Sequence, residues 1–165
     1  ALDEFVRGGG RLVAFAEAAE LPIEKFGLPV ENVVEGLPDT AFWSPGSTLR
    51  MNVDHTQPLA YGMPERAYGL FMQGNHAYRT VFQPESDRVS RPATYVERDV
   101  LQSGWLLGEE KIAERAAAVT VGHGEGTVVL IGFRPQFRHT THGTFKLVFN
   151  SLVSGPPGGM AAVEE

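Results

Sequence analysis

Basic and imidazole side chains gather in one turn near the carboxyl end of this sequence. Residues 126–152 read GTVVLIGFRPQFRHTTHGTFKLVFNSL, and the turn after the apolar run holds Arg134, Arg138, His139 and His142. A guanidinium group can bind a carboxylate through two parallel hydrogen bonds, and an imidazole can move protons or bind a metal ion. This turn is therefore the first place to look for chemistry.

The elements on either side of that turn would place it at the edge of a sheet. The run VVLIGF is short, continuous and rich in β-branched residues, which is typical of a strand covered on both faces. The segment after the turn is predicted to be a helix. One apolar face of it would be formed by the residues at positions i, i+3, i+4 and i+7, which are Phe145, Val148, Phe149 and Leu152. Ligands of open α/β sheets bind beyond the carboxyl ends of the strands, where such turns lie.

A second strand-turn-helix pattern occurs near the amino end, where RLVAF is followed by AEAAELPIEKFGL. Glu17 is the side chain of that turn best placed to reach the same sheet edge. It could form an ion pair with Arg134 or Arg138, or it could cap or solvate its own turn. Alternatively, Glu17 could be the base of a hydrolase assisted by His139 or His142, which requires hydrogen-bond distances of about 3 Å or a bridge of one water.

The sequence lacks the usual nucleophiles of hydrolases and transferases. There are no cysteines, which excludes thiolate nucleophiles, disulfides and cysteine-bound metals. No serine has the G-x-S-x-G context of a nucleophile elbow, and Ser103, in LQSGW, lacks the preceding glycine. Covalent catalysis through sulfur or an elbow serine is therefore not expected.

Two of the histidines, His139 and His142, have an H-x-x-H spacing that could present two nitrogens to one metal ion. A metal site needs further ligands, and none is near in the sequence, so we expect solvated loop residues or hydrogen bonders at a helix start. His55, His76 and His123 each stand alone, and we expect structural roles for them. Neither a metal nor a cofactor is predicted for this chain.

Composition and charge narrow the possible partners. With 165 residues, 42% of them hydrophobic, the chain can bury a core of its own. A net charge of −6 and a pI near 5.4 argue against binding to nucleic acid or to an anionic membrane. No apolar run reaches the roughly 20 residues of a membrane helix.

The two ends of the chain differ in pattern. Leu2, Phe5 and Val6 predict a helix that starts at the first residues, so we expect a piece of a longer protein. Residues 154–165, SGPPGGMAAVEE, have no periodicity and are dense in proline and glycine. We therefore expect a domain over residues 1–153 and a disordered tail over 154–165.

Strands and helical segments alternate along the chain. Strands are predicted at residues 11–16, 48–54 and 68–75 and in a glycine-turned hairpin over 117–133, with a helix starting at Glu109 and a surface loop at 83–93. The alternation favours an α/β sheet with helices on both faces and an antiparallel edge at the hairpin. A sheet truncated at its amino end would expose an unpaired strand edge, which favours a homodimer.

Several motifs in order resemble one known family. These are FVRGGGRLVAF, FWSPGSTLR, DHTQPLAYGM, SGWLLGE and VVLIGFRPQFRHTTHGTFKLVFN. They resemble the carboxyl-terminal domain of bacterial zinc carboxypeptidase-like proteins of the carboxypeptidase A clan. The resemblance covers Leu2 to Val153 and implies a class I glutamine amidotransferase-like domain of flavodoxin-like topology.

The same resemblance shows what this chain lacks. Active class I amidotransferases use a cysteine on the elbow after the strand matching RLVAF and a His-x-Glu pair after the strand matching VVLIGF. Here Glu17 and alanines stand at the elbow, and GFRPQFR replaces the pair. The resemblance therefore implies a catalytically inactive domain with a structural or ligand-binding role.

The candidate ligand-binding residues are Glu17, Arg50, Arg134 and Arg138, which could hold a small anionic or peptide ligand. We favour the alternative that the arginines pair structurally with Glu17, Asp54 or carbonyl groups.

The implied parent protein is a zinc metallocarboxypeptidase, secreted or periplasmic. In that family the zinc is held by an H-x-x-E pair and a distant histidine in an amino-terminal peptidase domain, which would be the partner of this domain. A purely structural oligomerisation domain is a further alternative, and it predicts an interface above about 1,000 Å².

Overall fold

A computed structural model describes residues 1–81 and 88–154 of the chain. Of the expected tail only Ser154 falls within this range, so disorder over 154–165 stays a prediction. The first part of the expected loop at 83–93 also lies outside the described residues.

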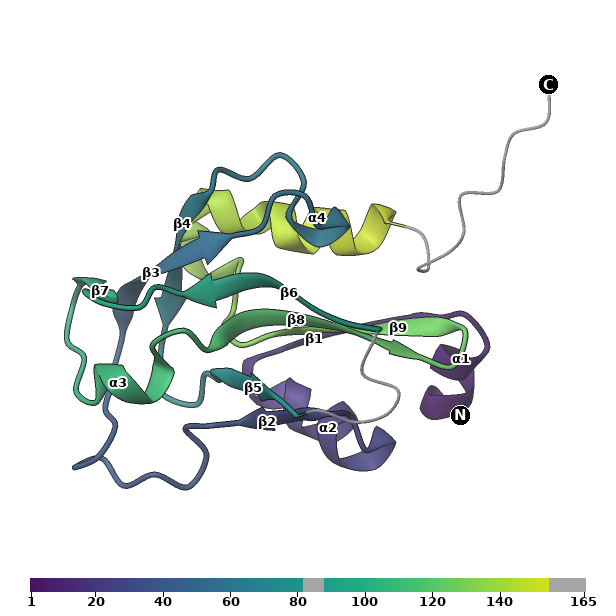
Figure 1. The fold of residues 1–165 in the computed structure, drawn as a ribbon, viewed down its shortest axis with the longest axis horizontal. Helices are drawn as coiled ribbons and strands as arrows, with labels where there is room; N and C mark the ends of the chain where they lie inside the picture. The colour runs from purple at the N-terminus through teal and green to yellow at the C-terminus, as the bar shows by residue number, and fades with distance from the viewer. Residues whose placement is uncertain (82–87, 155–165) are drawn as a thin grey trace.

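The described residues form one sheet of nine strands (Figure 1). Its main path runs through β1 (Arg11–Phe15), β9 (Gly126–Ile131), β8 (Ala116–His123), β6 (Val89–Tyr95), β3 (Ser47–Val53) and β4 (Arg66–Phe71). Beside this path lie β2 (Val30–Asn32), β5 (Tyr78–Thr80) and β7 (Leu101–Ser103). Among the described strand pairs only β1 and β9 run parallel, and the others are antiparallel.

The predicted β8–β9 hairpin is confirmed, but the prediction that it forms an edge of the sheet is wrong. His123 pairs with Gly126, and Gly124 between the two strands has φ of 59°. Asn or Gly at such positions lets a tight turn follow the twist of its strands. Because β1 then pairs with the free side of β9, the hairpin lies inside the sheet, and antiparallel pairing extends through most of it.

Helices cover both faces of the sheet, as predicted. In Figure 1, α4 (Phe145–Val153) lies on one face and α2 (Glu20–Phe26) on the other. The remaining helices are α1 (Leu2–Arg7) and α3 (Glu109–Ile112), and the short 3₁₀ turns are η1 (Ala16–Ala19), η2 (Pro58–Ala60), η4 (Phe137–His139) and η5 (His142–Thr144). No helix within the described residues is long and apolar enough to cross a membrane.

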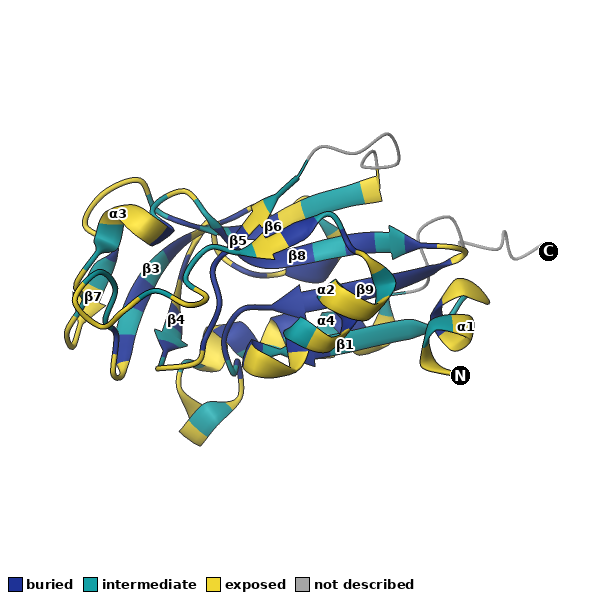
Figure 2. Ribbon diagram, turned by 90° about the horizontal axis from the view of Figure 1, so that it is seen from below, coloured by how far each residue is buried: buried dark blue, intermediate teal, exposed yellow. Residues whose placement is uncertain are grey.

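Alternate residues of β9 face two separate cores. Val129 and Ile131 pack in a cluster that includes Leu147 of α4. Val128 and Leu130 pack in a second cluster that includes Val6 of α1. All residues of β9 are buried, and β8 and β9 appear as the dark central strands of Figure 2. The strand covered on both faces is therefore confirmed, because side chains of a strand point alternately to its two sides.

The expected surface loop at 83–93 is wrong for residues 89–93, which belong to β6. Pro92 has no backbone N–H and cannot donate a hydrogen bond to a neighbouring strand. The pairing of β6 with β8 is irregular between Ser90 and Ala93, so β6 accommodates Pro92 without that hydrogen bond. The carbonyl of Pro92 still accepts a hydrogen bond from the backbone of Asp54 at 3.0 Å.

The helix predicted after the arginine-bearing turn is confirmed as α4, but the face predicted to be buried is wrong, since Phe145 and Val148 are only half-buried. Leu147 and Ser151 are the buried residues of α4. Phe149 is 61% exposed and Leu152 is 72% exposed, although both fall on the predicted apolar stripe. This leaves apolar side chains of α4 facing outward.

Candidate functional site at the elbow edge of the sheet

The carboxyl ends of β1 and β9 lie side by side, because their parallel register ends at the pair Phe15 and Ile131. We call this region, together with the β4–β5 loop that packs against it, the elbow edge. At the end of β1 the chain turns sharply, and Ala16 has φ of 48° while being only 1% exposed. An L-residue other than glycine is strained at positive φ, and such strain clusters at functional sites.

The predicted ion pair between Glu17 and Arg134 is present at this edge. The Arg134 Nη2 lies 2.8 Å from the Glu17 Oε2, with the two side chains 37% and 56% exposed. At this exposure the pair contributes about 0.2–1 kcal/mol. It joins the turn after β1 to the turn after β9.

The β4–β5 loop also lies close to the Glu17 side chain of the same elbow. Gly74 has φ of 79°, and a Cβ added there would lie 2.1 Å from the Glu17 Oε1. The positive φ favours glycine here, whereas the Glu17 carboxylate is the far end of a flexible side chain and can shift.

The other two candidate arginines contact other groups. The Arg50 Nε donates to the Gln102 Oε1 at 2.9 Å, and the same guanidinium donates to the Asp99 carbonyl. The Arg138 guanidinium carbon lies 5.4 Å from the centroid of the Phe137 ring. The favoured structural pairing is thus seen for Arg134 and Arg50, while a ligand-binding role of all four residues stays a prediction.

His139 and His142 pack against an aromatic ring instead of meeting Glu17. Their ring centroids lie 6.0 and 5.6 Å from that of Phe145. Within residues 1–81 and 88–154, no hydrogen bond or ion pair joins Glu17 to either histidine. The hydrolase alternative therefore lacks a direct contact between these groups, and a bridge of one water stays a prediction. The same ranges contain no group of three or more His, Asp or Glu side chains placed to hold a metal ion.

A buried histidine at the elbow edge has more specific partners than the sequence suggested. His76 is 2% exposed, and its Nε2 lies 3.3 Å from the Glu20 Oε1. Its Nδ1 lies 3.5 Å from the Tyr78 hydroxyl. Burial lowers the pKa of His76, and the Glu35 and Glu17 carboxylates oppose part of this effect. We therefore assign a neutral ring that donates from Nε2 to Glu20 and accepts from Tyr78 at Nδ1.

Backbone contacts fix His76 at the end of β9. The His76 amide donates to the Gly132 carbonyl at 2.5 Å, and the Gly132 amide donates to the Ala117 carbonyl at 2.8 Å. A Cβ at Gly132 would lie 2.2 Å from the His76 carbonyl oxygen. The glycines at 74 and 132 were visible in the sequence, but nothing there indicated that both approach the elbow edge.

A cavity of about 240 Å³ opens beside His76, and we call it the elbow cavity. Its lining includes Glu20, Asn32, Glu35, Asp39, Phe42, Trp43, Ser44, Phe71, Gly74, Asn75 and His76. Ser44 and Asn75 are each 3% exposed. Among the described residues, the Ser44 Oγ and the Asn75 Oδ1 have no hydrogen-bond partner. Buried polar atoms are rarely left unpaired in this way, so they mark the cavity as a candidate ligand site.

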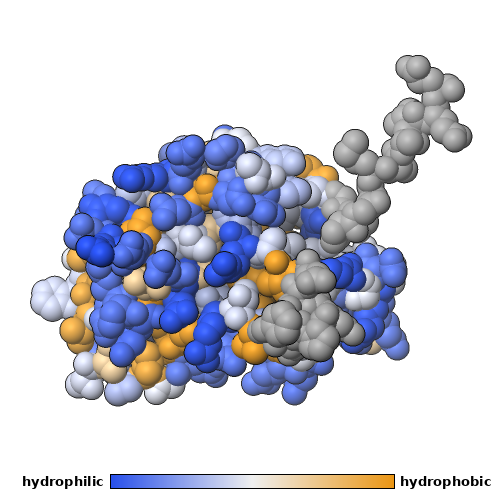
Figure 3. All heavy atoms as spheres, viewed as in Figure 1, coloured by the Kyte–Doolittle hydropathy of each residue, from blue (hydrophilic) through white to orange (hydrophobic). Residues whose placement is uncertain are grey.

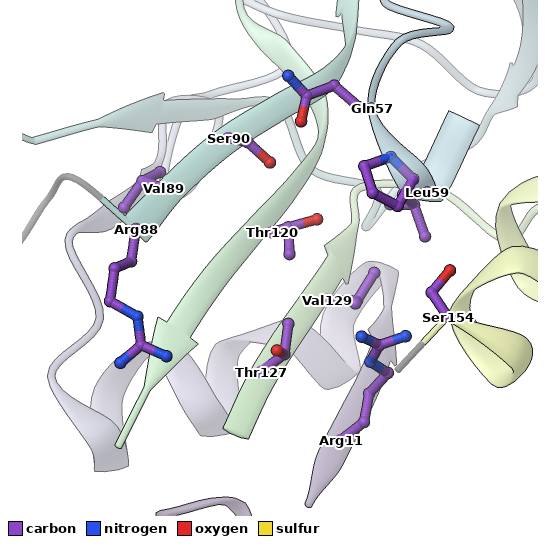
Figure 4. Close-up of a pocket in the computed structure, with 11 residues that line it drawn as sticks. Arg11, Gln57, Leu59, Arg88, Val89, Ser90, Thr120, Thr127, Val129 and Ser154 are labelled. Carbon is purple, nitrogen blue, oxygen red and sulfur yellow. The ribbon is translucent and has the colours of Figure 1, made fainter. Parts of the chain in front are cut away.

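Further cavities lie elsewhere. One, of about 330 Å³, is bordered by Arg11, Leu59, Thr127, Val129 and Ser154 (Figure 4). Its lining also includes Arg88, and both Arg88 and Ser154 adjoin in sequence the residues outside the described ranges. Another, of about 640 Å³, is lined by Arg50, Arg66, Arg98, Asp99 and Glu109 among others.

Comparisons with known proteins identify the fold. No protein-family model matches this chain, and no curated protein does. A ThuA-like protein from Bacteroides uniformis ATCC 8492 is 12% identical with a TM-score of 0.52, over 94% of this chain and 65% of that one. A GMP synthase subunit from Thermoplasma acidophilum is 12% identical with a TM-score of 0.54, over 92% of this chain and 60% of that one.

A third similar structure is the β-galactosidase from Bacillus circulans sp. alkalophilus. It is 12% identical with a TM-score of 0.51, over 91% of this chain and 19% of that one. At these identities the similarities establish the fold alone, and this chain spans less than two thirds of the length of each of the three structures. The predicted α/β fold of the amidotransferase-like and flavodoxin-like kind is therefore confirmed. These similarities do not bear on the carboxypeptidase parent.

Proposed function

We propose that this chain is a catalytically inactive amidotransferase-like domain that binds a ligand at its elbow edge and serves as an accessory domain of a zinc metallocarboxypeptidase. The observation that carries the proposal is Ala16. It occupies the strained turn after β1, the place where the resemblance puts the cysteine of an active enzyme. A methyl group cannot attack an amide, so no acyl-enzyme can form there.

The neighbouring groups support a binding role in place of glutamine hydrolysis. Glu17, the next residue, is held by Arg134, and that arginine stands in the turn where the resemblance expects a His-x-Glu pair. His76 is neutral and has a carboxylate partner, as a general base would, but no nucleophile of the elbow type is beside it. A strained backbone retained without a nucleophile is consistent with a surface that still recognises a ligand.

The arginines can serve a second, anionic ligand. Arg50, Arg66 and Arg98 share the lining of one cavity with Asp99 and Glu109. A guanidinium group in this lining can bind a carboxylate such as the end of a peptide.

The accessory role rests on the motif resemblance and on the outward apolar residues of α4. Phe149, Leu152 and Val153 are all exposed. Polar residues cover most of the face in Figure 3, where apolar residues form separate patches. We propose that α4 packs against the amino-terminal peptidase domain, or against a second copy of this domain. Zinc would belong to that peptidase domain.

Ammonia release from glutamine tests the inactivity of this domain. We expect the purified chain to release no ammonia above the blank, while an active class I amidotransferase assayed in parallel does. Release that saturates with glutamine concentration would contradict the proposal. The parent is tested separately by the zinc content and carboxypeptidase activity of the full-length gene product, which should contain an upstream H-x-x-E motif.

A further inference from the structure

We infer that the elbow cavity binds a small organic amine, with its ammonium group inside the cavity and a compact apolar body against the aromatic wall. The inference deepens the proposed function and rests on its ligand-binding role. Three independent features carry it: unpaired acceptors, the sign of the charge, and the aromatic lining.

The unpaired acceptors call for a hydrogen-bond donor. The Asn75 Nδ2 donates to the Leu70 carbonyl at 3.3 Å, which leaves the Asn75 Oδ1 as an acceptor without a partner among the described residues. The Ser44 Oγ is equally unpaired there and can accept a second hydrogen bond. The unpaired oxygens of Ser44 and Asn75 are enclosed by the protein. An ammonium group carries three donors and no acceptor, so it can pair with either oxygen once that side chain turns toward the cavity.

The charge around the cavity is negative. Glu20, Glu35 and Asp39 belong to its lining, and the lining contains no lysine or arginine. Within the described residues, neither Glu35 nor Asp39 forms an ion pair. Because His76 is neutral, it does not offset these carboxylates. A cation is therefore attracted to the cavity, and an anion of the same size is repelled.

The remaining wall is aromatic. Phe42 and Phe71 meet edge to face with centroids 5.7 Å apart, and Trp43 also belongs to the lining. Aromatic faces attract ammonium groups and pack against apolar carbon. A volume of about 240 Å³ accommodates a compact amine but no folded partner.

The shape of the site is fixed before any ligand enters. The Asn32 Oδ1 accepts hydrogen bonds from the amides of Val34 and Ala77, both at 3.3 Å. These bonds tie the loop after β2 to the loop before β5, so the two walls of the cavity are joined. Such preorganisation reduces the entropy that binding costs.

Calorimetric titration of the whole chain with three probes of equal shape tests the inference. Benzylamine, benzyl alcohol and benzoate differ chiefly in charge. We expect benzylamine to bind at least about tenfold more tightly than benzyl alcohol, and benzoate not to bind. Equal affinity for amine and alcohol, or tighter binding of benzoate, would overturn the inference.

Two variants locate the binding. Glu35→Gln should weaken benzylamine binding by about twofold to fivefold, because it removes one exposed charge that solvent partly screens. Ser44→Ala should weaken it by a similar factor with little change in stability, because the Ser44 Oγ has no hydrogen-bond partner within the described residues. Glu125→Gln, in the β8–β9 turn, is the matched control and should leave the affinity unchanged. Binding that neither Glu35→Gln nor Ser44→Ala affects would place the amine elsewhere and refute the site.

A fourth probe distinguishes the source of the amine. A lysine amide acetylated at its α-nitrogen represents a lysine side chain of a polypeptide, and its affinity relative to benzylamine tells a peptide ligand from a free amine. Tighter binding of either amine supports the inference that the cavity binds an ammonium group. If none of the amines binds, the inference is refuted. The ammonia assay is independent, since glutaminase activity would remove the proposed function whether or not amines bind.

Discussion

Replacing Gly132 by alanine should both destabilise the fold and disturb the elbow cavity. The added Cβ would lie 2.2 Å from the His76 carbonyl oxygen, which is backbone and cannot rotate away. The two backbones must separate by about 1 Å to reach ordinary contact, an overpacking change that costs about 1–3 kcal/mol. At this chain length each kcal/mol lowers Tm by about 2–4 °C, so a fall of about 2–12 °C is expected.

Urea unfolding followed by circular dichroism measures this cost directly. With an m value of about 2 kcal/mol/M, the midpoint should fall by about 0.5–1.5 M. Gly143→Ala is the matched control, because a Cβ there meets open space and the residue needs no positive φ. Its midpoint should stay within about 0.3 M of the parent. If Gly132→Ala unfolded at the parent midpoint, the end of β9 would not touch the His76 loop, and our account of the elbow edge would be wrong.

Three further predictions concern charge, pH and surface. A double-mutant cycle of Glu17→Gln and Arg134→Gln should give a coupling energy of about 0.2–1 kcal/mol, and a larger value would show that the pair is more buried than described. Because folding lowers the pKa of His76 from its usual 6.5, the unfolded chain binds more protons on acidification, so stability should be lost as pH falls through about 6.5. This loss should be smaller in His76→Gln, and identical pH profiles would refute it. Phe149→Ser combined with Leu152→Ser should change the stability of the isolated chain by less than about 1 kcal/mol but weaken any self-association seen by sedimentation.

Local patterns predicted the elements of this fold well. The β-branched run of β9, the glycine-turned hairpin and the strand-turn-helix after RLVAF are all present. These features depend on neighbouring residues, whose backbone preferences and alternation are written directly in the sequence. The ion pair of Glu17 with Arg134 was also predictable, because the ends of parallel strands meet at one edge.

Contacts between distant segments were not predictable in the same way. His76 stood alone in the sequence, yet Glu20 and Tyr78 contact its two ring nitrogens. Which side of α4 is buried was also missed, because the helical period fits several rotations of the helix against the sheet. Packing of α4 against η2 and η5 chose the rotation that buries Leu147 and Ser151.

The sequence by itself determined that no thiolate can act here, since the chain has no cysteine. It also determined that a strand buried on both faces ends in an arginine-bearing turn. Only the tertiary structure decided that Ala16 takes a strained conformation and that Asn75 and Ser44 line a cavity without partners among the described residues. The physical reason is that backbone strain and unpaired buried atoms arise when separate segments are packed together, and residue order alone does not specify which segments meet.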